Sequence, residues 1–98
     1  MFRGFPPKLN IRVLVFTTLR TKLGWKERTL RFSRDNVSLR EVFEKIPQLK
    51  NIVLDENGDL KKGYIVLING INCSSLGKLE AKLRNGDVVS IFPPAGGG

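Results

Sequence analysis

The sequence predicts a small α+β domain in which one main helix packs across one face of a single sheet. Three observations predict this class: strict alternation of apolar residues near the start, a capped amphipathic segment in the middle, and an alternating apolar segment close to the end. The chain has 98 residues, of which 41% are hydrophobic. A chain of this length buries roughly two thirds of its unfolded surface, so we expect one domain with one core.

The first predicted strand lies in KLNIRVLVFTT. Apolar residues recur there at every second position and give the strand one apolar face, which consists of Leu9, Ile11, Val13 and Val15. Leu14 and Phe16 point the other way. A short helical turn around residues 19–23 follows, and Gly24 breaks it. KERTLRF then alternates as a second strand, so the two strands form a hairpin-like pair.

The segment SLREVFEKIPQL predicts the main helix. Ser38 at the N-cap and Glu41 three residues later form a capping box, which satisfies backbone amides that would otherwise lack acceptors. The apolar residues that follow fall on one helix face, namely Leu39, Val42, Phe43 and Ile46. Pro47 lacks an amide hydrogen and its ring clashes with the preceding turn, so we expect it to end or bend a short helix.

Turn signals divide the remaining chain into further strands. The motif DENG predicts a turn, and GYIVLINGIN predicts a buried strand over residues 64–68 that leads into an Asn-Gly turn at 69–70. A second turn, Asn-Gly-Asp at 85–87, precedes VVSIF. This last strand alternates, with Val89 and Ile91 on one face and Phe92 on the other.

The composition excludes several classes of function. Cys73 is the only cysteine and histidine is absent, so a disulfide within the chain, a Cys/His zinc site and His-based catalysis are excluded. We therefore name no catalytic residue and no metal ligand. Cys73 follows a strand and has no basic neighbour in sequence, so we interpret it as a small packing residue. The longest apolar run, residues 64–68, is far shorter than the about 20 residues of a membrane span, and we expect a soluble, cytoplasmic protein that binds no membrane.

The net charge of +8 is concentrated in the first half of the chain. Residues 1–50 hold 12 basic and 4 acidic groups, and residues 51–98 hold 5 of each. The excess is either an ordinary solvated surface or a basic patch for phosphates or acidic proteins. An RNA-binding module over residues 17–34 is therefore one alternative function, although Trp25 and Phe32 are the only rings there for base stacking. The basic residues of this segment are Arg20, Lys22, Lys26, Arg28, Arg31 and Arg34.

The chain ends in IFPPAGGG, which predicts an extended tail. Prolines donate no backbone hydrogen bond, so they end the ladder and project the chain away as a stiff segment. The six residues beyond Phe92 span at most about 20 Å. Their small or absent side chains suit insertion into a narrow tunnel, with the terminal carboxylate exposed at its far end. We divide the chain into an N-terminal extension of unassigned role (1–7), a domain (8–92) and a tail for insertion (93–98), which consists of Pro93, Pro94, Ala95, Gly96, Gly97 and Gly98.

INGINCSSLGKLEAKLRNGDVVSIFPPAGGG resembles the C-terminal half of the sulfur-carrier family that includes the small subunit of molybdopterin synthase, the thiamine-pathway sulfur carrier and small archaeal modifier proteins. The family pattern is an Asn-Gly turn, a Leu-rich stretch, Gly-Asp before a final strand, Phe-Pro-Pro and a terminal Gly-Gly. TTLRTKLGWKE is similar to the segment after the first strand of molybdopterin synthase small subunits. The resemblance runs from about Lys8 to Gly98, with Ala95-Gly96 in place of the usual Val-Ala. It implies the ubiquitin-like β-grasp fold, with a mixed sheet and a flexible Gly-Gly tail.

The resemblance implies a carrier protein and not an enzyme. In the family, an ATP-dependent, E1-like enzyme adenylates the terminal glycine, here Gly98, and a sulfur donor protein converts it to a thiocarboxylate. The tail then inserts into the large subunit of molybdopterin synthase, which transfers the sulfur to the pterin precursor. The chain itself lacks a phosphate-binding GxxxxGK[ST] loop. We therefore expect no bound cofactor, and ATP is used by the partner enzyme.

Two aromatic residues are candidates for partner binding. Phe16 and Phe92 face away from the helix, and the first and last strands are neighbours in the β-grasp family. We expect an apolar patch at the root of the tail, with structural burial as the alternative. Trp25 is either an interface anchor or, as we favour, a half-buried loop residue. The nearest alternative function is a ubiquitin-like modifier that is joined to lysines of target proteins through Gly98, whereas nucleic acid is not an expected partner.

Overall fold

The computed structural model describes residues 8–95. The N-terminal extension (1–7) and the last three glycines of the tail (96–98) therefore lie outside the described residues. The strands are β1 (Leu9–Val15), β2 (Glu27–Phe32), β3 (Val37–Ser38), β4 (Ile65–Ile68), β5 (Ile71–Asn72), β6 (Lys82–Leu83) and β7 (Val88–Phe92). The helices are α1 (Thr18–Leu23), α2 (Leu39–Lys45) and α3 (Pro47–Val53), with short 3-10 turns η1 (Cys73–Ser75) and η2 (Lys78–Glu80).

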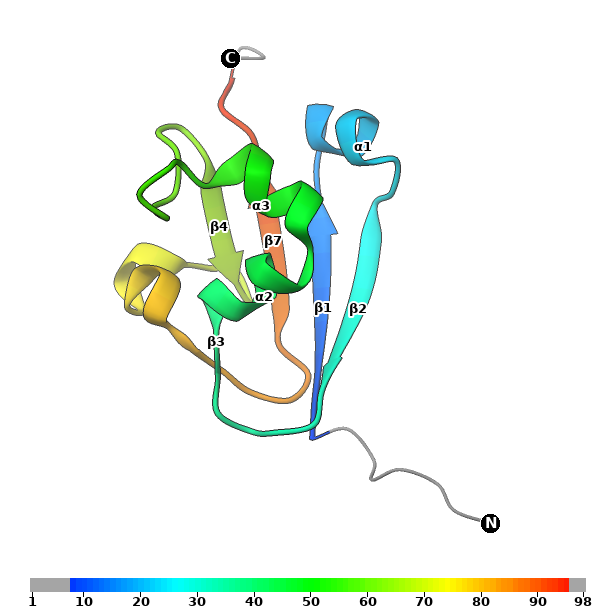
Figure 1. Ribbon diagram of the computed structural model, residues 1–98, viewed down its shortest axis with the longest axis vertical. Coiled ribbons are helices and arrows are strands. Elements are labelled where there is room, and N and C mark those ends of the chain that lie inside the picture. Colours follow the sequence, from blue (N-terminus) through cyan, green and yellow to red (C-terminus); the bar gives the residue numbers. More distant parts are fainter. Residues whose placement is uncertain (1–7, 96–98) are drawn as a thin grey trace.

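The main sheet is mixed and has the strand order β2-β1-β7-β4-β5. β1 pairs antiparallel with β2 and parallel with β7, and β4 pairs antiparallel with both β7 and β5. The first and last strands are therefore neighbours at the centre of the sheet (Figure 1). β3 and β6 form a separate antiparallel pair. This arrangement confirms the predicted α+β class with a mixed sheet.

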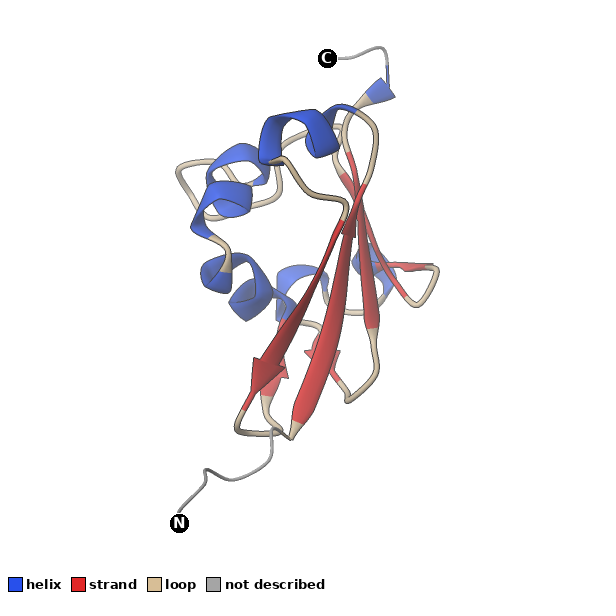
Figure 2. Cartoon of the chain, turned by 90° about the vertical axis from the view of Figure 1, so that its right-hand side faces the viewer, coloured by secondary structure: helices blue, strands red, loops and turns tan. Residues whose placement is uncertain are grey.

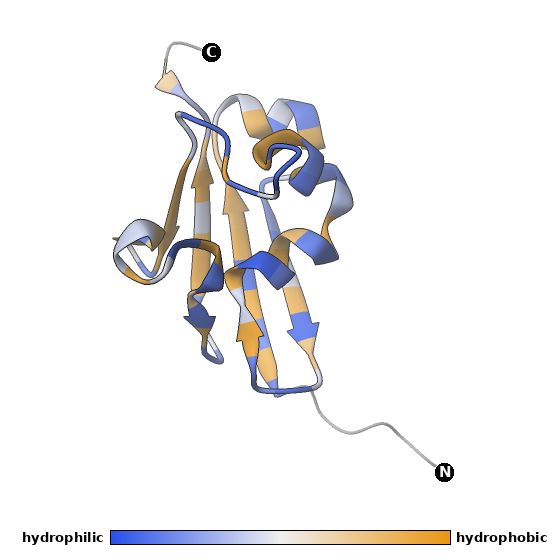
Figure 3. Ribbon diagram, turned by 60° about the vertical axis from the view of Figure 1, so that its left-hand side comes forward, coloured by the Kyte–Doolittle hydropathy of each residue, from blue (hydrophilic) through white to orange (hydrophobic). Residues whose placement is uncertain are grey.

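The helices lie on one side of the main sheet, and the other side is open (Figure 2). The side chains of the predicted apolar face of β1 are all buried, and so are Val89 and Ile91 of β7. From the helical side, Phe43 is the largest side chain that is fully buried. The hydrophobic strands face the helical layer across this core, and hydrophilic residues line the loops around it (Figure 3). The alternation of apolar residues predicted for β1 and β7 therefore matches the alternation of buried side chains in these strands.

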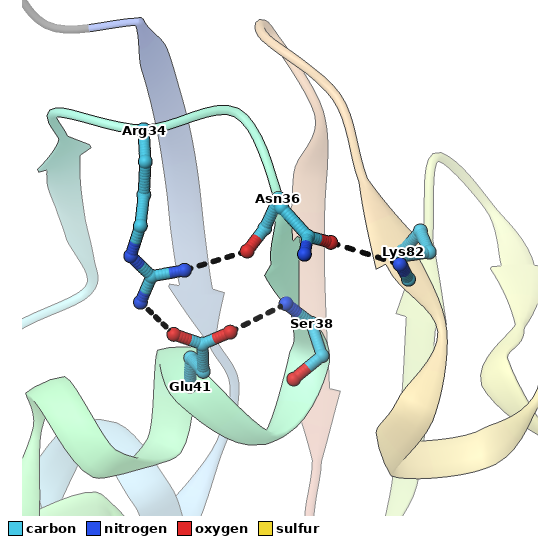
Figure 4. A network of polar contacts seen from close by, with 5 residues as sticks. All are labelled: Arg34, Asn36, Ser38, Glu41 and Lys82. Atoms are coloured by element: carbon cyan, nitrogen blue, oxygen red, sulfur yellow. Dashed lines mark hydrogen bonds and ion pairs between the residues drawn. The ribbon is translucent and has the colours of Figure 1, made fainter.

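A polar network fixes the start of α2 (Figure 4). The carboxylate of Glu41 accepts a hydrogen bond from the Ser38 backbone amide at 3.1 Å and forms an ion pair with Arg34. Arg34 also donates to the carbonyl of Asn36, whose side-chain oxygen accepts from Lys82 Nζ at 2.8 Å. The ion pair first, and the amide second, lower the pKa of Glu41. The predicted capping box of Ser38 and Glu41 is present, and the network connects the helix start to β6.

Pro47 ends α2 as predicted, but it also begins a helix that the sequence analysis missed. α2 ends at Lys45, Ile46 leaves the helical conformation with φ −126° and ψ 80°, and α3 starts at Pro47 itself. A proline suits the first turn of a helix because the amide it lacks has no acceptor there and its fixed φ is already helical. In place of the single predicted main helix there are therefore two consecutive short helices, α2 and α3, which meet at Ile46.

The strand predicted over residues 64–68 begins one residue later, at Ile65, and is buried on one face only. Val66 and Ile68 are buried, whereas Ile65 is 45% exposed. The apolar run predicts a buried strand, but helices cover a single face of the sheet, so alternate residues of β4 face the open side. Within residues 8–95, the structure has no helix that is both long enough and apolar enough to cross a membrane.

Candidate functional site at the root of the tail

The tail leaves the molecule from the centre of the main sheet. β7 ends at Phe92, directly before the two prolines, and it lies between β1 and β4. Because β1 and β7 are parallel, their C-terminal ends lie at the same end of the sheet, close to α1 (Figure 1). Pro93 and Pro94 are half-buried and Ala95 is exposed. The first residues of the tail are thus held by the domain, whereas Gly96, Gly97 and Gly98 lie beyond the described range.

Phe16 and Phe92 form a stacked pair at this end of the sheet. Their ring centroids are 4.3 Å apart and their planes differ by 9°. The backbone aligns them, because the amide of Phe16 donates to the carbonyl of Ile91 at 3.2 Å. Arg20 extends the stack: its guanidinium carbon lies 5.0 Å from the Phe16 centroid, and its Nε donates to the Val15 carbonyl at 2.8 Å. The structure brings the two predicted residues together on the open face, and their partner-binding role stays a prediction.

Ile65 is a member of this apolar cluster that the sequence analysis missed. It is the register partner of Phe92 across β4 and β7, so both side chains project from the same face. We call Phe16, Ile65 and Phe92 the tail-root patch. The apolar run of β4 has no local signal that singles out Ile65, because such a run looks the same whether one or both faces of the strand are covered.

On its other side, the tail contacts the loop that precedes β4. A methyl group added at Gly63 would lie 2.9 Å from both Cβ and Cγ of Pro94, so the proline ring rests directly against the glycine backbone. Gly63 has a φ of +92°, which L-residues with side chains rarely adopt. It is the third residue of a turn in which the amide of Tyr64 donates to the Lys61 carbonyl at 3.2 Å. No sequence pattern indicated a role for this turn.

The basic segment of residues 17–34 offers little to a stacked base. The guanidinium carbon of Arg28 lies 4.7 Å from the ring of Trp25, which is half-buried as favoured from the sequence. Phe32 is buried, and Lys45 lies over its ring at 5.5 Å. The two rings that an RNA-binding surface would use are therefore occupied by cations of the chain itself or buried in the core, which disfavours base stacking.

Cys73 takes no part in the tail root. It is buried in η1, and burial raises the pKa of its thiol. A buried thiol with a raised pKa is a poor nucleophile, because the thiolate is the reactive form. Cys73 is thus a packing residue, as predicted. In the part of the chain that the structure describes, no group of three His, Cys, Asp or Glu residues is placed to hold a metal ion.

Comparisons with known proteins relate this arrangement to one family. The model of the ThiS family matches residues 13–98, which is most of the chain. The small archaeal modifier protein 1 of Methanosarcina acetivorans is 31% identical, over 97% of this chain and 100% of that one, with a TM-score of 0.69. No curated protein sequence matches the chain significantly.

Two further solved structures are similar. A putative molybdopterin converting factor, subunit 1, from Pyrococcus furiosus is 22% identical over 89% of this chain and 99% of that one, with a TM-score of 0.64. A chain of the Amycolatopsis orientalis BexX/CysO complex is 25% identical over 90% and 99%, with a TM-score of 0.68. These similarities confirm the expected ubiquitin-like β-grasp fold.

Proposed function

This chain belongs to the ThiS family of ubiquitin-like sulfur carriers, and from that premise we propose that its terminal Gly98 is the group that carries sulfur. The observation that best supports this role is the tail root. A stiff Pro-Pro segment leaves the centre of the sheet beside a partly exposed apolar patch. A partner that binds the tail-root patch therefore receives the tail at a fixed position.

The proposed chemistry takes place on a partner, because a free carboxylate is a poor acyl donor. An E1-like adenylating enzyme joins a carboxylate oxygen of Gly98 to the α-phosphate of ATP and releases pyrophosphate. Sulfur at the oxidation level of sulfide, supplied by a sulfur donor protein, then attacks the acyl carbon and displaces AMP, which leaves a thiocarboxylate. Glycines near the carboxylate allow close approach to the nucleotide, since they have no side chain to collide with the enzyme. The chain contributes the acyl group and its placement, and we propose that it works in the cytoplasm, where ATP is supplied.

We propose molybdopterin, and so the molybdenum cofactor, as the destination of the sulfur. The similarity to the Pyrococcus furiosus putative molybdopterin converting factor supports this destination. On this proposal the chain is the small, non-catalytic subunit of a molybdopterin synthase, and the tail inserts into the large subunit. The BexX/CysO complex supports partner proteins of the sulfur-transfer kind. The tail residues that meet the partner are those from Pro93 to Gly97, with Pro93 and Pro94 at the entrance and the later residues inside.

Protein modification is the second candidate function. It is supported by the small archaeal modifier protein 1 of Methanosarcina acetivorans, which is similar over nearly the whole of both chains. The same activated Gly98 would react with the ε-amino group of a target lysine and form an isopeptide bond. Both functions share the adenylation step. They differ in the acceptor: the pterin precursor takes the sulfur, whereas a target lysine takes the acyl group.

Thiocarboxylate formation tests the shared step. The full chain is incubated with ATP, an E1-like enzyme and a sulfur donor, and intact-protein mass spectrometry is expected to show exchange of one oxygen for sulfur at Gly98. A chain without Gly97 and Gly98 lacks the terminal Gly-Gly and is expected to remain unmodified and to fold normally by circular dichroism, because end residues contribute little to stability. Thiolation of the shortened chain would show that the carrier site lies elsewhere. Adding a molybdopterin synthase large subunit with pterin precursor, or candidate target proteins, then shows whether sulfur or the acyl group is transferred.

A further inference from the structure

We propose that the turn of residues 61–64 is a seat for Pro94 and sets the direction in which the tail leaves the domain, with Gly63 as the positioning residue. This inference rests on the proposed carrier function of Gly98 and extends it to a part of the chain distant in sequence from the tail. The Phe16–Phe92 stack holds the tail root on the open face of the sheet. The seat holds it from the loop before β4.

The contact between Gly63 and Pro94 requires the absence of a side chain. A Cβ at position 63 would approach two ring carbons of Pro94 at 2.9 Å and its Cα at 3.6 Å. The shorter distance is well below ordinary van der Waals separation, so any other residue at position 63 pushes Pro94 away or distorts the turn. Pro94 responds by moving its whole peptide unit, because its ring fixes φ and leaves few other adjustments.

The seat is itself anchored to the folded core. The backbone amide of Lys61 donates to the carbonyl of Val53 at 2.8 Å, and its Nζ lies 3.4 Å from the carbonyl of Asn51. Val53 is fully buried at the end of α3. The amide of Tyr64 closes the turn onto Lys61. Because the turn is fixed to a buried helix end, it resists movement, and a side chain added at position 63 displaces Pro94 instead.

A fixed direction matters because the tail is short. The four residues after Pro94 span at most about 14 Å, so the direction in which the tail starts limits the region that the terminal carboxylate can reach. Fixing the first residues of the tail also removes part of the ordering entropy that insertion would otherwise cost. The reaction at Gly98 is sensitive to such placement, because misplacement of a reacting group by about 1 Å can slow a reaction on the order of 100-fold.

The matched pair Gly63→Ala and Gly70→Ala tests the seat. Both glycines have positive φ, +92° and +85°, so alanine strains the backbone at both, but a Cβ at Gly70 meets nothing within 4 Å. Gly70 lies in the turn between β4 and β5, at the opposite end of β4 from the tail. The measurement is adenylation of the full chain by an E1-like enzyme, followed as ATP–pyrophosphate exchange. We expect Gly63→Ala to lower kcat about tenfold with KM changed less than about twofold, since binding through the tail-root patch is retained. Gly70→Ala is expected to lower the melting temperature similarly and to leave both constants within about twofold of the original.

A double-mutant cycle with Pro94→Gly separates displacement of the tail from general strain. Pro94→Gly removes both ring atoms that a Cβ at position 63 would approach at 2.9 Å, including the Cβ that alanine would keep, and it is expected to lower kcat by about threefold, because the seat then has nothing to hold. If Gly63→Ala acts by pushing these atoms away, the double variant has the kcat of Pro94→Gly alone, which is a partial rescue. Three results would each contradict the proposed seat. The losses in kcat could multiply in the double variant, Gly63→Ala and Gly70→Ala could have equal effects on kcat, or Gly63→Ala could be adenylated faster than the original chain. An original chain that is not adenylated at Gly98 would instead overturn the carrier function itself.

Discussion

The two faces of the main sheet are built from the same strands but differ in how far their side chains are buried. On the covered face, alternate residues of β1 and β7, such as Val13 and Ile91, are completely buried under the helices. On the open face, the neighbouring positions still include large apolar side chains, and Ile65 remains 45% exposed. Phe16 and Phe92 are also only half-buried. A sheet that needed only to fold would carry polar residues there, so the difference separates residues that hold the domain together from residues available to a partner.

Truncating the covered face is expected to have the largest effect. Phe43→Ala removes the largest fully buried side chain and leaves a cavity, so we expect it to lower the free energy of unfolding by about 3–5 kcal/mol. Urea denaturation followed by circular dichroism measures the change. Phe43→Leu, which keeps most of the volume, is the control and should lose much less. A loss below 1 kcal/mol, roughly the size expected for a surface change, would mean that this face does not dominate stability.

Truncating the open face is expected to affect binding more than stability. Phe92→Ala and Phe16→Ala should each weaken binding to an adenylating enzyme or a synthase large subunit by roughly 1–3 kcal/mol, as aromatic residues near interface centres do. Isothermal titration calorimetry measures the affinity of each variant for the partner protein. Ile71→Ala offers a control at the far edge of the sheet, where the side chain is 52% exposed. Unchanged affinity together with a large drop in melting temperature would show that the two rings serve the core.

The smallest effect is expected at the polar network over the start of α2. The folded-state pKa of Glu41 is lowered by Arg34 and the Ser38 amide, so its contribution to stability is present above the unfolded-state pKa and disappears as pH falls through the folded-state pKa. Because Arg34 is half exposed, we expect Glu41→Gln to cost at most about 1 kcal/mol at neutral pH. Denaturation curves across pH should show the two proteins converging in acid. Glu44→Gln, on an exposed position of the same helix, is the control, and a difference that grows in acid would contradict the assignment.

Most of the fold could be predicted from local patterns. Alternation in β1 and β7, the Ser38–Glu41 signature and the Asn-Gly turn all depend on residues close in sequence, and the structure has each of them. α3 was missed because proline both ends one helix and begins the next, and sequence spacing alone does not separate these roles. The exposure of Ile65 was missed because an apolar run looks the same whether one or both of its faces are covered.

The candidate site was predictable in part, for a related reason. Phe16 and Phe92 were identified because each alternates with buried neighbours, and because strand order in the resembling family placed them side by side. The contact between Gly63 and Pro94 joins residues of two different loops. Its only local signal is a glycine in a turn, which many turns have without a tail against them. The direction of the tail therefore depends on tertiary structure that local patterns do not encode.

The central position of β7 determines how the domain responds to force on its end. β7 is paired with β1 on one side and β4 on the other, and the tail continues directly from it. A pull along the tail acts parallel to the strand, so the hydrogen bonds of both ladders bear the load together in shear. An edge strand pulled away sideways would instead lose its bonds one after another. We therefore expect that partner proteins can bind, pull on and release the tail repeatedly while the domain stays folded.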